Sequence, residues 1–127
     1  TPLRWKRSTM RLEGFVEKGW GSELIWVTND QYCSKFLRFN SGSQFSMHFH
    51  RDKKESWYVM DGLFEVTWIE TKDASVHTKS LVEGDVFTNE VLVPHQVLCI
   101  EKGTIIEVST PDSVEDNYRV GKGDSQK

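Results

Sequence analysis

Residues 42–62 read GSQFSMHFHRDKKESWYVMDG, and this stretch decides the fold. His48 and His50 are two residues apart, so on a β-strand their side chains share one face. Glu55 follows after a short turn, and glycines stand at both ends of the stretch, where tight turns need them. The pattern predicts strand, turn and strand, with two imidazoles and a carboxylate facing one cavity.

A further ligand candidate is His95, which follows Gly84 by eleven residues on a segment that a closed sheet can bring alongside the first. Imidazole nitrogens with one carboxylate suit a divalent transition metal and leave coordination positions for water or substrate. The competing interpretation is that these histidines are packed or surface residues. We predict one divalent ion (zinc, manganese, nickel or iron) bound by four ligands: His48, His50, Glu55 and His95.

The proposed ligands also predict a pH dependence. Neutral imidazole is the form that binds a metal, and free histidine protonates near pH ~6.5. Metal affinity is therefore expected to fall as the pH drops through that region.

The rest of the chain is a series of short strands separated by turns. Segments rich in β-branched and aromatic residues alternate with turn-forming pairs such as Asp61-Gly62 and Lys102-Gly103. Only residues 113–119 are compatible with a helical turn or two. Regularly spaced strands of this kind predict an all-β sandwich or barrel. We expect strands at residues 24–28, 32–39, 44–50, 57–60, 63–70, 75–81, 96–100 and 104–109.

Length and composition suit a single domain. The chain has 127 residues, of which 28% are charged, and its net charge is −3, so neither nucleic acid nor a membrane is expected as a partner. Cys33 and Cys99 lie in apolar strand-like runs, which favours buried thiols in a reducing compartment and predicts a cytoplasmic protein.

We divide the chain into an N-terminal arm and edge segment (1–23), a barrel (24–120) and a flexible tail (121–127). The chain begins with Thr1, which is compatible with a domain excised from a longer protein. The arm is basic, and we expect it to be either solvated or docked on an acidic partner. Its positive charges are Arg4, Lys6, Arg7 and Arg11. Trp5 and Trp20 are candidates to cover a sheet edge or a dimer surface.

The spacing of these residues resembles the cupin superfamily. Gly42-x5-His48-x-His50-x4-Glu55-x6-Gly62 resembles the first cupin motif, and Gly84-Asp85 with Pro94-His95 resembles the second. The resemblance implies a double-stranded β-helix, or jelly roll, with the metal near one end of the barrel. It also implies a homodimer, since cupins commonly pair through their sheets.

The flanking sequence is similar to one branch of that superfamily, the cupin domain of type II mannose-6-phosphate isomerases and mannose-1-phosphate guanylyltransferases. The similarity lies in residues 20–23, in the strand with Lys35, Leu37 and Phe39, and in Ile106-Glu107-Val108. It implies a carbohydrate substrate and a fused or associated nucleotidyltransferase domain. The spacing between His50 and Glu55 is longer here than in that branch.

Isomerisation of a sugar needs a Lewis acid and a base that moves a proton between adjacent carbons. Lys35 and Glu107 are the candidate bases; if Lys35 faces inward, desolvation is expected to lower its pKa, and otherwise it is a solvated edge residue. Trp57 shares the face of Glu55 and is expected to line the substrate pocket, where it either stacks on a sugar or fills the core.

Three functions remain open at this stage. The first is a metal-dependent isomerase or epimerase acting on a sugar phosphate or nucleotide-sugar precursor. The second is an iron-dependent cupin dioxygenase, and the third is a carbohydrate-binding or regulatory cupin without turnover. An inward acid or base beside the metal favours an enzyme, and a purely apolar pocket favours the binding module.

Overall fold

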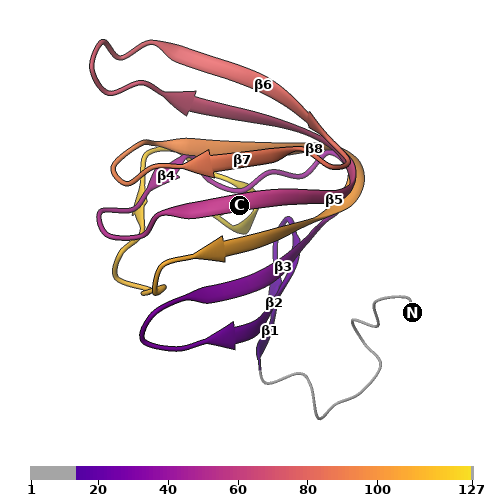
Figure 1. Ribbon diagram of the computed structural model, residues 1–127. Helices are drawn as coiled ribbons and strands as arrows, with labels where there is room; N and C mark the ends of the chain where they lie inside the picture. Colours follow the sequence, from indigo (N-terminus) through magenta and orange to yellow (C-terminus); the bar gives the residue numbers. More distant parts are fainter. Residues whose placement is uncertain (1–13, 127) are drawn as a thin grey trace.

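The computed structural model describes residues 14–126, and this part of the chain is all-β, as predicted. Its strands lie mostly antiparallel to their neighbours in one curled sheet (Figure 1). The elements are β1 (Phe15–Lys18), β2 (Gly21–Thr28), β3 (Cys33–Phe39), β4 (His48–Phe49), β5 (Glu55–Ile69), β6 (Val76–Val82), β7 (Val86–Asn89), β8 (His95–Ser109), β9 (Tyr118–Arg119) and the 3-10 helix η2 (Asp124–Gln126).

Two long strands, β5 and β8, connect the two halves of the sheet. In one half they lie between β7 and the β3-β2-β1 group, and in the other between β6 and the β4-β9 pair. Figure 1 shows both strands bending sharply from one half into the other. The two halves therefore enclose an interior that receives side chains from both.

The bend corrects one sequence prediction. Asp61-Gly62 and Lys102-Gly103 were expected to be turns between separate strands, but both pairs lie inside continuous strands, at register shifts between β5 and β8. Gly62 has φ +90°, and a Cβ there would lie 2.7 Å from the Cα of Gly103. Two facing glycines let the backbones approach closely where the strands turn the corner.

The core fills this interior with aromatic and aliphatic side chains from the inward positions of the strands. Trp20 stacks on Phe39 with ring centroids 4.5 Å apart, and Phe39 meets Phe64 edge-to-face at 5.3 Å. Cys33 and Cys99 are buried free thiols, as expected from their apolar neighbours, and burial raises the pKa of both. These contacts surround the site with closely packed side chains.

Both ends of the described chain are attached to the body outside the expected barrel of residues 24–120, the N-terminal end by strands and the C-terminal end by hydrogen bonds. β1 and most of the first half of β2 precede residue 24. Segment 121–126, expected to be a flexible tail, is hydrogen-bonded to the body: Gly19 N donates to Ser125 Oγ (3.0 Å), and Gln44 N donates to Asp124 Oδ2 (2.8 Å). Residues 113–119 form turns and β9 instead of a helical turn.

The basic residues Arg4, Lys6, Arg7 and Arg11, with Trp5, lie outside the described residues. Within the described residues, no helix is long and apolar enough to cross a membrane.

The outer face of the first half-sheet carries a row of apolar side chains. Cross-strand pairing places six of them side by side over six strands. Two of them are well exposed, Val86 at 60% and Tyr58 at 47%, and the other four are partly buried. The homodimer expected from the sequence stays a prediction. The row is Val86, Tyr58, Ile106, Phe36, Leu24 and Phe15.

Candidate metal centre

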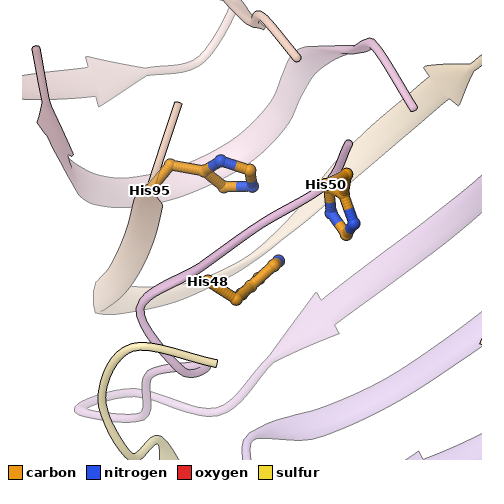
Figure 2. A group of neighbouring side chains, drawn as sticks. All are labelled: His48, His50 and His95. Carbon is orange, nitrogen blue, oxygen red and sulfur yellow. The ribbon is translucent and has the colours of Figure 1, made fainter. Parts of the chain in front are cut away.

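Three histidines from two segments of the sheet meet in the interior. His48 begins β4, His50 directly follows that strand, and His95 begins β8, where it is paired in register with His48. One ring nitrogen from each lies within 4.8 Å of the others. Figure 2 shows the three side chains directed toward one another. The structure thus brings together the histidines that the sequence had singled out.

Hydrogen bonds fix the protonation of each ring. Each Nδ1 atom lies at hydrogen-bond distance from a backbone carbonyl oxygen. The pairs are His48 with Ser46 (2.7 Å), His50 with Asp116 (2.6 Å) and His95 with Val93 (3.0 Å). A carbonyl oxygen only accepts, so each Nδ1 carries the proton and donates it. In a neutral ring the Nε2 atom is then a free lone pair, the form that binds a metal.

Glu55 lies against this cluster at the start of β5. It is 2% exposed, with Oε1 3.5 Å from His50 Nε2 and Oε2 3.5 Å from His95 Nε2. Asn89 Nδ2 donates to Oε2 at 3.2 Å and orients the carboxylate. Burial raises the pKa of Glu55, but His95, Lys53 and His50 outweigh burial and hold it well below its usual range.

These groups fit a divalent metal. Among the described residues, the Nε2 atoms of His50 and His95 and the Oε1 atom of Glu55 are buried without a hydrogen-bond partner. Buried acceptors without a donor are costly, and here two ring nitrogens face a carboxylate oxygen whose charged contact outside the cluster is the ion pair with Lys53 at 3.2 Å. A cation between them satisfies all of them, and nitrogen with carboxylate oxygen suits a transition metal.

Burial favours the neutral form of His48 and His50. Desolvation, together with the neighbouring imidazoles, lowers the pKa of His48 to about 3. Desolvation also lowers the pKa of His50, with Lys53 adding to the effect. At these two ligands, competition between protons and metal therefore begins below the pH ~6.5 that the sequence analysis took from free histidine.

A cavity of about 310 Å³ opens beside the histidines. Its wall is strongly charged and includes His48, His50 and Glu55 together with both candidate bases, Lys35 and Glu107. Exposed cations, Lys18 and Arg119, also line it. The other members of the charged wall are Glu23, Lys53 and Asp112.

Lys35 faces inward, but its expected pKa is wrong. Burial does push the pKa of Lys35 down; the carboxylates of Glu107, Glu23 and Asp112 outweigh burial and raise it above the usual value. The lysine Nζ lies 3.8 Å from Glu107 and 3.5 Å from Glu23. Lys35 is consequently a permanent cation at neutral pH and unsuited to be a base.

The pKa of Glu107 is raised as well, but for a carboxyl group a raised pKa favours the neutral form. Burial and the charge of Glu55 raise the pKa of Glu107 above its usual value, against the opposing effect of Lys53 and Lys35. Its Oε1 accepts a hydrogen bond from Trp57 Nε1 at 3.2 Å. Trp57 was expected to line the pocket, but its ring is 1% exposed and packs in the core. Trp57 contributes to the site through its N–H.

Besides Asn89, three residues of the site were missed by sequence analysis. Lys53 is buried with its Nζ 3.2 Å from Glu55 and 3.5 Å from Glu107. Its position two residues before Glu55 was the signal that could have placed it on the same face. Asp112 and Asp116 follow β8, in a segment whose sequence carries no comparable pattern.

Asp116 organises the turn that separates the first ligands. Its carboxylate accepts hydrogen bonds from three consecutive backbone N–H groups, those of Arg51, Asp52 and Lys53, at 2.7, 3.1 and 3.1 Å. Its own carbonyl accepts the Nδ1 proton of His50. One residue therefore fixes both the turn and the orientation of a ligand ring.

No family model matches the chain, and no curated protein matches it. Solved structures of similar fold include KdgF from Halomonas sp. (19% identity, TM-score 0.65, 74% of this chain and 81% of that one). An RmlC-like cupin from Shewanella frigidimarina is similar at 24% identity and TM-score 0.63, covering 74% of this chain and 78% of the other.

A variant of the oxalate decarboxylase OxdC from Bacillus subtilis is similar over 83% of this chain at 22% identity and TM-score 0.71, but over only 29% of its own length. That decarboxylase contains Mn(II) centres. These likenesses show the predicted fold, the cupin jelly roll. They give no support to the finer resemblance to mannose-6-phosphate isomerases.

Proposed function

We propose that this protein is a metal-dependent cupin enzyme that moves a proton between adjacent carbons of a small anionic sugar. The reaction is of the isomerase or epimerase type, and a sugar phosphate or nucleotide-sugar precursor is the substrate class expected from the sequence. The observation that carries the proposal is Glu107, a buried carboxyl group of raised pKa in the same cavity as the histidine cluster. Such a group is suited to accept and return a proton.

The metal ligands are His48, His50, His95 and Glu55. A divalent ion bound there supplies a Lewis acid that polarises a substrate carbonyl or hydroxyl group. Asn89 holds the carboxylate of Glu55, and the backbone carbonyls hold the three rings, so the ligands are oriented before the ion arrives.

The proton is handled by Glu107. The N–H of Trp57 and the ammonium of Lys53 both contact its carboxylate, at 3.2 and 3.5 Å, and hold it in one orientation. Lys35 stays protonated and stabilises negative charge in the cavity. The role of base, which the sequence divided between Lys35 and Glu107, is assigned to Glu107 alone.

A charged cavity with an acid–base group supports an enzyme over a binding module without turnover, whose pocket needs only apolar walls and a few fixed polar groups. The iron-dependent dioxygenase differs from the isomerase in its metal. If the bound ion were iron and the protein consumed oxygen, the dioxygenase would replace the isomerase as the proposed function.

The test is proton exchange with solvent. The manganese- or zinc-loaded protein is incubated in D₂O with a panel of sugar phosphates, nucleotide-sugar precursors and sugar acids, and proton NMR follows loss of the signal beside the carbonyl carbon. The proposal predicts exchange with at least one substrate, absent in Glu107→Gln and retained in Glu101→Gln, which changes an exposed carboxylate. No exchange across the panel, or full exchange in Glu107→Gln, contradicts it.

A further inference from the structure

Asp112 occupies a site between two buried lysines. Its Oδ2 accepts a hydrogen bond from Lys35 Nζ at 2.9 Å, and its Oδ1 lies 3.2 Å from Lys53 Nζ. The two lysine side chains are only 7% and 6% exposed. Each oxygen of one carboxylate therefore has its own ammonium group, so the lysine pair has the spacing of a carboxylate receptor.

Asp112 differs from the other carboxylates of the cavity in its backbone position and its exposure to solvent. Glu23, Glu55 and Glu107 stand on strands, and their side chains are 15%, 2% and 6% exposed. The Asp112 side chain is 31% exposed and lies between β8 and β9, in a segment without regular secondary structure.

The segment that carries Asp112 is attached on both sides of it. Thr110 N donates to the carbonyl of Lys54 at 3.0 Å, and the Asp116 carboxylate holds the turn at Arg51. Between these attachments, Asp112 can leave the lysines by a local backbone and side-chain change while the sheet stays intact.

The charges of the cavity point to what replaces it. With a divalent ion bound, the ion and the two lysines carry four positive charges, and the three strand carboxylates carry three negative ones. Asp112 supplies the fourth. Because two buried ammonium groups without a counter-charge are costly, an anion that takes the place of the Asp112 carboxylate keeps them paired. Exposed Lys18 and Arg119 on the wall of the same cavity attract an incoming anion.

We infer that the Lys35–Lys53 pair is the anion-binding subsite of the cavity and receives a carboxylate group of the substrate in place of the Asp112 side chain. The inference rests on the proposed function only in taking the incoming anion to be a substrate. Among the small anionic sugars of the proposed function, it narrows the substrate class to those that carry a carboxylate, and so selects sugar acids over simple sugar phosphates.

The test uses acetate as the probe and the metal-loaded protein, with affinity measured by calorimetry at constant ionic strength against chloride. Asp112→Ala removes the resident carboxylate and should bind acetate at least tenfold more tightly than the wild type. Adding Lys35→Met to Asp112→Ala should abolish the gain. Glu115→Ala, which removes an exposed carboxylate from the same segment, is the matched control and should keep the wild-type affinity.

Equal acetate affinity in the wild type and Asp112→Ala overturns the inference, as does an equal gain in Glu115→Ala or a gain that survives Lys35→Met. Tighter binding of inorganic phosphate than of acetate by Asp112→Ala overturns the carboxylate class. Asp112→Ser, which also vacates the position between the two lysines, replaces Asp112→Ala if the latter does not fold. Failure of the proposed reaction appears separately, as absent deuterium exchange with the acetate gain intact.

Discussion

Lys35 and Glu107 are paired in register on β3 and β8, and both side chains enter the same cavity, with Nζ 3.8 Å from Oε2. The pairing joins the two candidate bases into one charged unit. Glu107 raises the pKa of Lys35, and Lys35 opposes the rise in the pKa of Glu107. The two residues therefore have different roles, one as a fixed cation and one as a proton carrier.

Replacing Glu107 with Gln should lower kcat by about 10²- to 10⁴-fold, the usual contribution of a general acid–base group. The metal content should stay at the wild-type level, because Glu107 is not among the ligands. Steady-state kinetics and elemental analysis on the same preparation measure both. A loss of less than about fivefold in kcat would remove Glu107 from the role of proton carrier.

Replacing Lys35 with Met should move the acid limb of the kcat profile to higher pH. The positive charge of Lys35 favours the ionised form of Glu107, so its removal raises the pKa of Glu107 further. A pH–rate profile measures the shift. Lys54→Met is the control, since the Lys54 side chain is 54% exposed and pairs with Glu90 outside the cavity. An unshifted profile in Lys35→Met argues against Glu107 as the titrating group.

The metal-free protein should lose stability as the pH falls below ~6.5, where histidine in the unfolded chain takes up a proton. Burial lowers the folded-state pKa of His48 and His50, so between that pH and the folded pKa the unfolded chain binds more protons. For His48 the loss continues until about pH 3.

Urea unfolding at several pH values measures this dependence. His77→Gln, which changes an exposed histidine, should keep the wild-type slope, whereas His48→Gln should reduce it. Constant stability between pH 7 and pH 5 is incompatible with neutral buried histidines.

The bend of β5 and β8 gives a prediction about stability. Gly62 has φ +90°, and Gly62→Ala places a Cβ against the backbone of Gly103. The substitution should lower the free energy of unfolding by about 3 kcal/mol or more. Gly42 also has a positive φ, +80°, but a Cβ there meets nothing within 4 Å, so Gly42→Ala should cost only about 1–2 kcal/mol. Equal costs in chemical unfolding would show that close approach of the strands contributes nothing.

The fold class and the position of the histidines were predictable because both depend on local patterns. A two-residue step places His48 and His50 on one face, and glycine spacing marks the ends of that motif. The bend at Gly62 and Gly103 was not predictable, since an Asp-Gly pair reads as a turn when its cross-strand partner is unknown. Strands β1 and β7 were missed because each has only four residues.

The charge interactions in the cavity were also not predictable from the sequence. Alternation placed Lys35 on one face with Leu37 and Phe39 but left open whether that face is inward. The sign of its pKa shift depends on carboxylates from β2, β8 and the segment after β8. Asp112 reaches the lysines only through the path of that segment. Trp57 lies on the expected face, but surrounding aromatic side chains cover its ring. Such effects arise from tertiary packing, which local periodicity does not encode.

Elemental analysis by mass spectrometry, on protein purified without chelators or an affinity metal column, tests directly whether the histidine cluster holds a divalent metal. We expect about one divalent ion per chain in the wild type and almost none in folded His48→Ala and His95→Ala. Zinc, manganese or nickel favours the isomerase, and iron favours the dioxygenase. No metal after reconstitution, or full metal retention in both variants, would contradict the account.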